Sequence, residues 1–330
     1  MPMETLVAKL STGGIVIDGL IPWSKGFLPA GANLGAVLAK FSDAGVHHVS
    51  LTTASGFDDT RTALERIGFV HAELRAAGIP IANTASAIRT HHAQGQLSAG
   101  IHFQSATPYF PNLDTVETFA ALGVRRAILA YNRANVFADG CHEPRNAGLS
   151  DLGKALCRRM DAAGVRVDLS HCGERTAFDA LELGLTTPPF ASHSNARALF
   201  DHERNISDDL IKAIAEAGGT VGINGVGIFL GEGSLDLPAA MARHAAHIAD
   251  LIGEENLTLG SDYMFLDGSD FGFYYANAAT FPKGYPPPPW QFAGAAELAA
   301  LPAALSAVGF SSEGIRGLMG ETYLARVAPD

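Results

Sequence analysis

Three features are scarce in this sequence, and each scarcity excludes a class of protein. Only three cysteines, Cys141, Cys157 and Cys172, occur in 330 residues. This is too few for a disulfide framework and favours a reducing compartment. Basic residues are also few, with 23 Lys and Arg against 34 Asp and Glu and a formal net charge of −11. Because phosphate binding needs clustered positive charge, we expect no nucleic-acid partner.

Long hydrophobic runs are missing as well. No segment has the roughly 20 consecutive apolar residues that a membrane helix needs, and the opening MPMETLVAKLSTGG has no long apolar core. We therefore expect a cytoplasmic protein without a membrane partner. No Gly-x-Gly-x-x-Gly opens a helix after the first expected strand, which argues against dinucleotide binding. With 47% hydrophobic and 17% charged residues, the composition is that of a globular protein with a large core.

Short apolar runs rich in Val and Ile alternate with Ala- and Leu-rich segments along the chain. The runs are typical of parallel strands buried on both faces, and the segments between them have the i, i+3, i+4 spacing of amphipathic helices. We predict strands at Gly14–Asp18, His47–Thr52, Ser98–Gln104, Arg126–Tyr131, Val165–His171, Phe190–His193, Thr220–Asn224 and Leu257–Asp262. Eight such units predict an α/β fold, a (β/α)8 TIM barrel forming one domain over residues 1–330. The alternative is an open, doubly wound sheet.

One segment breaks this alternation. Phe271–Phe292 is rich in aromatic residues and contains four consecutive prolines, which cannot continue a helix or a central strand. Because it follows the eighth predicted strand, we expect a loop over the barrel mouth at about residues 264–292. Two interpretations stay open: a lid whose aromatic side chains line a pocket, and an ordered surface loop or a contact within a homodimer.

Polar side chains stand at the carboxyl ends of the predicted strands, where barrel enzymes place their chemistry. His171 ends the fifth strand, His193 the sixth and Asp262 the eighth. One such histidine alone is more often structural, but two imidazoles converging on one point are what a zinc ion needs. A nearby carboxylate that is not a ligand can serve as general base. We therefore predict His171 and His193 as metal ligands and Asp262 as a catalytic residue.

Four further residues lie near the same rim. Gln104 and Tyr131 end the third and fourth predicted strands, and we expect them to stabilise a developing oxyanion by hydrogen bonds, with Tyr131 acting in catalysis. His102 lies two residues before Gln104 and therefore on the same strand face. His142 follows the fourth strand in a loop on the functional rim. We predict Gln104, His102 and His142 as substrate-facing groups.

Several motifs extend this pattern over nearly the whole chain. They are Asp168–Thr176 (DLSHCGERT), Ala191–Arg197 (ASHSNAR), Asp201–Asn205 (DHERN), Gly218–Asn224 (GGTVGIN), Leu259–Asp262 (LGSD) and Gly309–Arg316 (GFSSEGIR). Together they resemble the membrane (renal) dipeptidase family, peptidase family M19. The resemblance implies a (β/α)8 barrel of metal-dependent hydrolases that cleave dipeptides, typically with two zinc ions bridged by a glutamate and a water. It also implies that His171 and His193 hold the second zinc, that Asp262 moves the proton and that Arg204 clamps the substrate carboxylate.

The first metal site of that family is not matched. Where the family has His-x-Asp after the first strand, this chain has Leu20 and Pro22, neither of which can bind a metal. Gln104 replaces the bridging glutamate, and Tyr131 stands where the family has a substrate-facing histidine. A bacterial branch with Phe-Gln-Asn on strand three and Tyr-Asn after strand four is similar to this chain. Because anionic ligands offset the repulsion between two cations, we predict at most one zinc ion.

Three functions are compatible with these residues. The first is a hydrolase acting on a dipeptide or a dipeptide-like amide, with one metal-activated water and Asp262 as base. The second is a reprogrammed enzyme, such as a lyase or an isomerase, in which His171, His193, Asp262 and Tyr131 perform acid–base chemistry. The third is a non-catalytic binding protein, which the retention of these groups together with Arg204 disfavours. In each case we expect a small-molecule partner.

Overall fold

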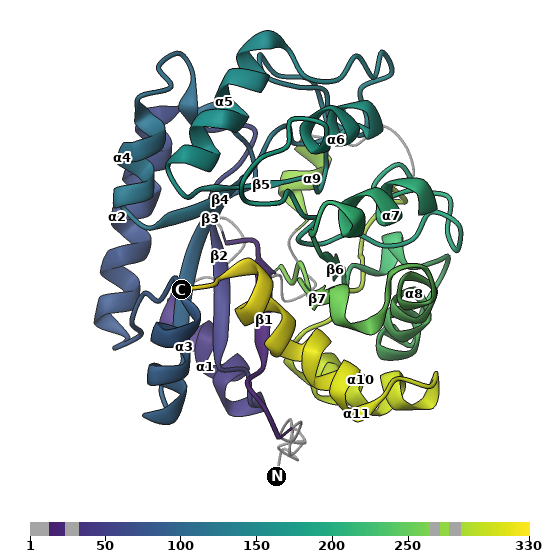
Figure 1. Cartoon of the computed structure of the whole chain (residues 1–330). Helices are drawn as coiled ribbons and strands as arrows, with labels where there is room; N and C mark the ends of the chain where they lie inside the picture. Colours follow the sequence, from purple (N-terminus) through teal and green to yellow (C-terminus); the bar gives the residue numbers. More distant parts are fainter. Residues whose placement is uncertain (1–12, 24–32, 265–270, 277–284) are drawn as a thin grey trace.

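The computed structural model describes residues 13–23, 33–264, 271–276 and 285–330, and its α/β fold is built on a curled parallel sheet (Figure 1). Five strands pair in sequence order, and two more form a second parallel pair. They are β1 (Ile17–Ile21), β2 (His48–Ala54), β3 (Ser98–Phe103), β4 (Val124–Ile128), β5 (Arg166–Asp168), β6 (Val221–Ile223) and β7 (Leu257–Leu259). Nearly every strand residue is buried, as expected for a parallel sheet covered on both faces.

The sixth predicted strand, Phe190–His193, is shorter in the structure than in the prediction. It makes only isolated parallel bridges, one between Phe190 and Asp168 of β5 and one between Ala191 and Val221 of β6. These two bridges connect the five-stranded sheet to the two-stranded pair. The segment therefore occupies the place of a strand without forming a regular ladder.

The two ends of the sheet meet between β1 and the residues that follow β7. The backbone N–H of Asp262 donates to the carbonyl of Leu20 over 3.0 Å. The backbone N–H of Ser261 donates to the Asp18 carboxylate over 2.9 Å, and the Ser261 hydroxyl donates to the same carboxylate. These contacts close the sheet into a TIM-barrel-like arrangement.

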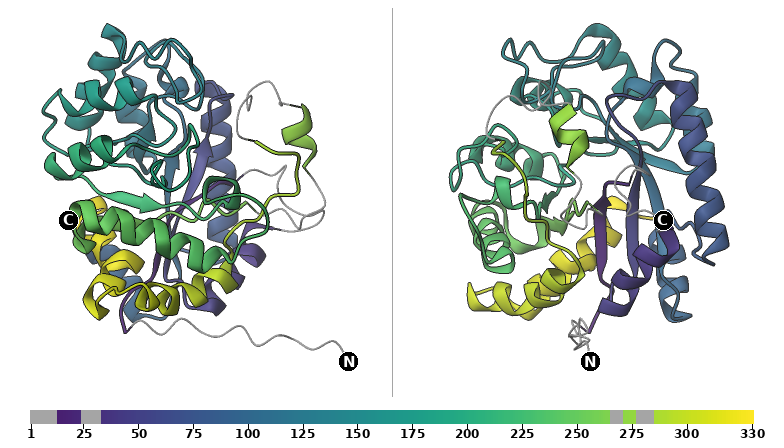
Figure 2. Two further views of the ribbon diagram at one scale, coloured as in Figure 1. Left: turned by 90° about the vertical axis from the view of Figure 1, so that its right-hand side faces the viewer. Right: turned by 180° about the vertical axis from the view of Figure 1, so that it is seen from behind.

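Helices cover the outside of this sheet, as Figures 1 and 2 show. They are α1 (Leu34–Ala44), α2 (Thr60–Ala76), α3 (Ala85–Ala93), α4 (Thr115–Ala121), α5 (Asp151–Ala162), α6 (Glu174–Leu181), α7 (Asp208–Glu216), α8 (Leu237–Ile252), α10 (Ala295–Ala307) and α11 (Ser312–Arg316). The short helix α9 (Gly272–Ala276) belongs to the segment after β7 and stands apart from the sheet (Figure 2). Serine side chains cap α5 and α7, where Ser150 and Ser207 accept backbone N–H groups of the first turn. Within the described ranges, no helix is long and apolar enough to cross a membrane.

The amino-terminal end of the barrel is closed by the last part of the chain. Tyr323 and Leu324, in a π-helical turn (Tyr323–Val327), pack in one apolar cluster with Ile17 and Phe190. Figure 2 shows the yellow carboxyl-terminal helices at the same end of the molecule as the first described residues. The opposite end, where the strands point, is consequently the end at which a site can open.

Candidate active site

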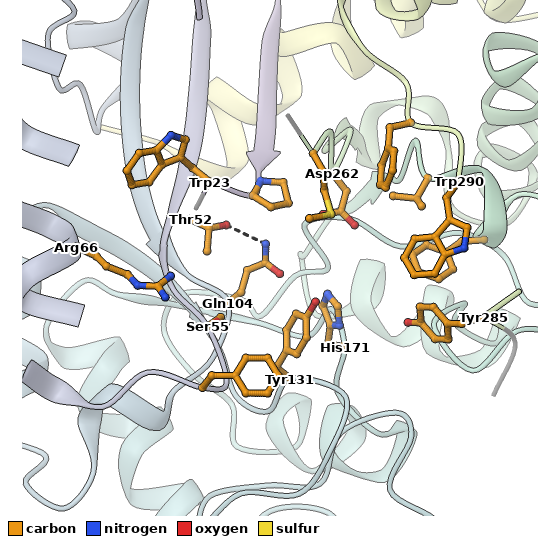
Figure 3. Close-up of a pocket in the computed structure, with 16 residues that line it drawn as sticks. Trp23, Thr52, Ser55, Arg66, Gln104, Tyr131, His171, Asp262, Tyr285 and Trp290 are labelled. Atoms are coloured by element: carbon orange, nitrogen blue, oxygen red, sulfur yellow. Dashed lines mark hydrogen bonds between the residues drawn. The ribbon is translucent and has the colours of Figure 1, made fainter. Parts of the chain in front are cut away.

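A cavity opens at the carboxyl ends of the strands (Figure 3). Its polar lining includes Thr52, Gln104, Tyr131, His171 and Asp262. Aromatic side chains form much of the remaining wall, among them Trp23, Phe57, Phe229, Tyr285, Trp290 and Phe292. The cavity therefore combines a small set of convergent polar groups with an apolar surround, which is typical of a small-molecule site.

His171 and His193 meet at this end of the barrel. Their Nε2 atoms are 3.0 Å apart, and both rings are buried. The other nitrogen of each ring is held from behind: Nδ1 of His171 lies 2.6 Å from the Asn132 side-chain oxygen, and Nδ1 of His193 lies 2.7 Å from the Ser192 hydroxyl. Because an amide oxygen only accepts, His171 donates at Nδ1 and carries a lone pair at Nε2.

Burial lowers the pKa of both His171 and His193 well below the usual value, and the nearby Arg204 guanidinium lowers it further. Both rings are therefore neutral at neutral pH, which is the form that binds a metal. Two facing Nε2 lone pairs repel each other at 3.0 Å. Either a proton carried by His193 or a cation has to lie between them.

Three residues of this site have a left-handed backbone. Asn132, His171 and Asp262 have φ angles of 60°, 63° and 57°. Each lies three or four residues beyond the end of β4, β5 or β7, so these strands end earlier than the sequence predicted. The left-handed residue stops the extended backbone, which explains why His171 and Asp262 follow their strands rather than belonging to them.

Asp262 supplies a carboxylate to the cavity. Its Oδ2 atom accepts a hydrogen bond from the Asn224 side chain over 3.0 Å. Burial raises the pKa of Asp262 to about 7, against the opposing influence of the Arg204 guanidinium. A carboxyl group with this pKa can both take and return a proton near neutral pH.

The side of the cavity formed by β2 and β3 holds neutral polar groups. The Gln104 side-chain nitrogen donates to the Thr52 hydroxyl over 2.9 Å, and that hydroxyl lies 2.9 Å from Nε2 of His102. His102 also contacts the Ser50 hydroxyl at 2.9 Å through Nδ1. The structure therefore places His102 one layer below Gln104, inside the barrel and outside the cavity lining.

A guanidinium lies deeper in the same part of the barrel. Arg126 of β4 contacts Nδ1 of His102 at 3.1 Å, donates to the carbonyl of Gly19 and lies 3.7 Å from the carboxylate of Asp168. Its positive charge contributes to lowering the pKa of His102 and of His193. The guanidinium of Arg126 thus places a positive charge in the barrel interior below Gln104.

The two histidines satisfy only part of what a zinc site requires. A catalytic zinc ion normally has three protein ligands. In the part of the chain that the structure describes, no group of three or more His, Cys, Asp or Glu side chains is arranged to hold a metal. Leu20 is completely buried in the core and Pro22 lines the cavity, so neither position supplies a first-site ligand. Among the described residues, the two imidazoles of His171 and His193 are thus the metal-binding groups that converge at this point.

Arg204 and His142 lie beside the cavity rather than in its lining. The Arg204 guanidinium is buried 5.2 Å from the centroid of Phe229 and donates to the carbonyl of His193 over 3.3 Å. His142 is buried and reaches the cavity only through Tyr285, whose hydroxyl lies 3.3 Å from its Nε2 atom. Both predicted substrate-binding residues therefore stand one layer behind the wall.

The sequence did not single out several residues of this site. One of them is Asn132, whose side chain accepts a hydrogen bond from His171. Asparagine tolerates the left-handed backbone found at this position, and this preference is the signal that could have identified it. Thr52, Ser55 and Arg66 also line the cavity, but nothing in their sequence neighbourhood marks them. Three aromatic residues of the predicted mouth loop line it too: Tyr285, Trp290 and Phe292. Residues 265–270 and 277–284 of that loop lie outside the described residues.

Comparisons with known proteins agree with this architecture. A family model described as membrane dipeptidase (peptidase family M19) matches residues 29–328. An uncharacterised dipeptidase of Schizosaccharomyces pombe is 34% identical over 187 residues, which are 54% of this chain and 44% of that protein. A dipeptidase of Aspergillus oryzae is 32% identical over 189 residues, 55% of this chain and 43% of that protein. The matched regions thus span less than half the length of these two curated relatives.

Among solved structures, an amidohydrolase from Pseudomonas aeruginosa superimposes with a TM-score of 0.84 and covers 96% of both chains at 24% identity. At this level of identity the likeness shows the fold alone. The fold is therefore α/β and TIM-barrel-like, and the open, doubly wound sheet is excluded.

Proposed function

Because the chain belongs to the membrane dipeptidase family, peptidase family M19, we propose that it hydrolyses a dipeptide or a dipeptide-like amide. One observation carries the proposal: the Nε2 atoms of His171 and His193 converge to 3.0 Å at the end of the barrel where Asp262 lines the cavity. These are the groups that the resemblance to the family assigns to the second zinc and to proton transfer. Their arrangement supports hydrolysis by an altered site.

We propose that the site holds at most one zinc ion, with His171 and His193 as its ligands. Asn132 and Ser192 support this assignment, because hydrogen bonds to the outer nitrogens keep both Nε2 atoms directed at one point. A zinc ion bound there supplies a Lewis acid that polarises a carbonyl group and lowers the pKa of water.

Asp262 performs the proton transfer in this proposal. Its raised pKa, about 7, makes it a base that accepts a proton from the attacking water and an acid that returns it to the leaving amine nitrogen. The hydrogen bond from Asn224 holds the carboxylate in one orientation during both transfers. Because the anion needs no metal contact for this task, Asp262 is free to act as proton carrier.

Tyr131 and Gln104 contribute hydrogen bonds to the substrate in this proposal. Burial raises the pKa of Tyr131, so that its hydroxyl stays protonated and donates to a developing oxyanion. The ring is stacked on His171 with centroids 4.1 Å apart, which fixes its direction. One N–H of the Gln104 side chain donates to Thr52, which leaves its second N–H as a donor for the oxyanion and its amide oxygen as an acceptor for a substrate N–H.

Arg204 binds the substrate carboxylate in the proposal. Its Nε atom is buried and has no hydrogen-bond partner among the described residues, which leaves one donor of the guanidinium available. Phe229, on which the guanidinium stacks, forms part of the cavity wall. A carboxylate at this wall would satisfy the buried charge and the spare donor together.

A second candidate function rests on the same histidine pair. A proton between the two Nε2 atoms would link Ser192, His193, His171 and Asn132 in one hydrogen-bonded chain. Such a chain, together with Asp262, could move protons in a lyase or isomerase reaction without a metal. This alternative is favoured by the observation that, in the ranges the structure describes, no third His, Cys, Asp or Glu side chain joins the pair as a ligand.

One experiment separates the two. Protein purified without chelator and then supplied with zinc should bind close to one ion per chain, and it should release amino acids from members of a dipeptide panel. A chelator should abolish that release, and zinc should restore it. Zinc stoichiometry near zero, with turnover unaffected by chelator, would favour the metal-free alternative.

We also place the protein in the cytoplasm, with a small molecule as its partner and a homodimer as its possible assembly. The three cysteines are free thiols in the structure, as a reducing compartment would keep them. Fractionation of the producing cells and light scattering of the purified protein test these two points.

A further inference from the structure

Three residues from separate segments form a hydrogen-bonded chain that ends at the cavity. The Glu203 carboxylate lies 2.5 Å from Nδ1 of His142, and Nε2 of His142 lies 3.3 Å from the Tyr285 hydroxyl. His142 follows β4, Glu203 precedes α7, and Tyr285 belongs to the proline-rich segment. Of the three, only Tyr285 lines the cavity, and Figure 3 shows its hydroxyl directed toward Tyr131 and His171.

The ring of Tyr285 is fixed by its neighbours. Its centroid lies 5.4 Å from that of His202, 5.6 Å from that of Trp290 and 5.8 Å from that of Phe229. All three rings are inclined to it, at interplanar angles of 73°, 55° and 84°. A ring enclosed in this way presents its hydroxyl at one position, so the direction of the hydroxyl does not depend on a bound ligand.

The position of each proton in the chain follows from the donors and acceptors. A carboxylate only accepts, so Nδ1 of His142 donates to Glu203. Burial lowers the pKa of His142, which leaves its Nε2 with a lone pair at neutral pH. The Tyr285 hydroxyl consequently donates to His142, and toward the cavity that Tyr285 lines its oxygen can act only as an acceptor. A ligand group that meets this oxygen has to be a hydrogen-bond donor.

We propose that Tyr285 binds an N–H group of the substrate through its phenol oxygen, and that His142 and Glu203 position it. The inference rests on the proposed function, because a dipeptide-like amide carries such donors at its amino group and at its amide nitrogen. It assigns His142, which the sequence placed on the functional rim, a role that acts through Tyr285. It also assigns the proline-rich segment a specificity-determining residue.

Three small compounds identify the N–H group. Alanyl-glycine has both donors, propionyl-glycine lacks the amino group, and alanyl-sarcosine lacks the amide hydrogen. With alanyl-glycine, Tyr285→Phe should lower kcat/KM about tenfold, the usual size of one lost hydrogen bond to a charged or strongly polar group, mainly through KM. With the analogue that lacks the relevant donor, wild type and variant should behave alike. Binding of each compound measured by calorimetry extends the comparison to an analogue that is not cleaved.

Variants of Glu203 test the positioning role. Glu203→Ala removes the acceptor of His142, and we expect it to reproduce part of the loss seen in Tyr285→Phe with the same dependence on the analogue. Glu203→Gln keeps an acceptor oxygen and should restore most of the wild-type kcat/KM. Tyr275→Phe, the same substitution at an exposed tyrosine, serves as the matched control and should leave every value unchanged.

The outcomes distinguish this inference from the proposed function. If wild type cleaves dipeptides but Tyr285→Phe changes all three compounds equally, or none of them, the inference is overturned and the proposed function stands. If wild type neither cleaves nor binds any member of the dipeptide panel, the proposed function fails and this inference fails with it. Melting temperatures of the variants close to that of wild type exclude misfolding as the cause.

Discussion

The two sides of the cavity mouth come from one barrel but carry different chemistry. The side that follows β5 and β7 keeps titratable groups, with His171 and Asp262 in the lining and His193 directly behind. The side that follows β2 and β3 presents the neutral hydrogen-bonding groups Thr52 and Gln104 at the strand ends. Arg66 of α2 also lines the cavity on this side, but its charge is paired with Asp58. The imidazole and the carboxylate of the described lining are thus gathered at the ends of β5 and β7, while the ends of β2 and β3 offer neutral hydrogen-bonding groups.

The neutral side is backed by buried polar groups in the barrel interior. Its hydrogen bonds run inward, from Gln104 through Thr52 to His102 and then to Arg126. The side chains of Thr52, Gln104 and His102 thereby each have a hydrogen-bond partner, as buried polar groups need. Because Arg126 is a permanent cation below these groups, a metal ion near Gln104 would meet positive charge in place of the anionic ligands it requires. The comparison predicts that reactivity lies on the titratable side.

Removing the proton carrier on the titratable side should have the largest effect on catalysis. We expect Asp262→Asn to lower kcat about a thousandfold, within the range for general acid–base groups, while a bound dipeptide remains detectable by calorimetry. Asparagine keeps the shape and tolerates the left-handed backbone of this position. Activity close to that of wild type would show that the titratable side does not carry the chemistry.

The hydroxyl of Tyr131 should have the next largest effect. Tyr131→Phe keeps the stacking on His171 and removes one donor, and we expect kcat to fall by about 10- to 100-fold with KM little changed. Steady-state kinetics on the best member of the dipeptide panel measure both values. An increase in KM at constant kcat would instead identify Tyr131 as a binding group.

Adding an anion on the neutral side should make the two sides of the cavity more alike in their affinity for a metal ion. Gln104→Glu adds a carboxylate beside Thr52, and we expect the affinity for zinc to rise about tenfold, because anionic ligands offset the charge of the ion. Zinc titration followed by calorimetry measures the change. Gln94→Glu adds the same charge on the exposed surface and should have no effect. Equal affinities of Gln104→Glu and wild type would show that Gln104 lies away from the metal position.

The smallest expected effect is the dependence of kcat/KM on pH. With the pKa of Asp262 at about 7, the base form is lost as the pH falls, so kcat/KM should be about half its plateau at pH 7 and about a tenth at pH 6. Bound zinc should move this limb to lower pH, since a nearby cation stabilises the carboxylate. A profile that is flat between pH 5 and 8 would exclude Asp262 as the base.

Much of the fold follows from the sequence because buried parallel strands have a strong apolar pattern. Seven of the eight predicted strands occur as strands at shifted bounds. The exception, Phe190–His193, is apolar enough to be predicted, but only Phe190 and Ala191 find bridge partners. Its regular ladder is missing because the backbone N–H groups of Ser192 and His193 donate to the Asp168 carboxylate and the Ser170 hydroxyl. Such side-chain competition is not visible in an apolar pattern.

The site was predictable where residues follow strands and not where they come from distant loops. The convergence of His171 with His193 follows from neighbouring strand ends. By contrast, the contact between His142 and Tyr285 joins residues 143 positions apart, and no periodicity encodes it. Arg66 reaches the cavity from α2, where it forms an ion pair of 3.0 Å with Asp58, and a helical arginine carries no sign of this.

The left-handed backbone at Asn132, His171 and Asp262 limits which residues these positions can hold. Apart from glycine, only asparagine, aspartate and histidine adopt that conformation with any frequency, and the three positions contain one of each. Natural or designed substitutions at these three positions are therefore best tolerated among four residues: histidine, aspartate, asparagine and glycine, which has no side chain. The barrel can exchange a ligand for a base there without altering its backbone, whereas an aliphatic replacement would have to rebuild the turn.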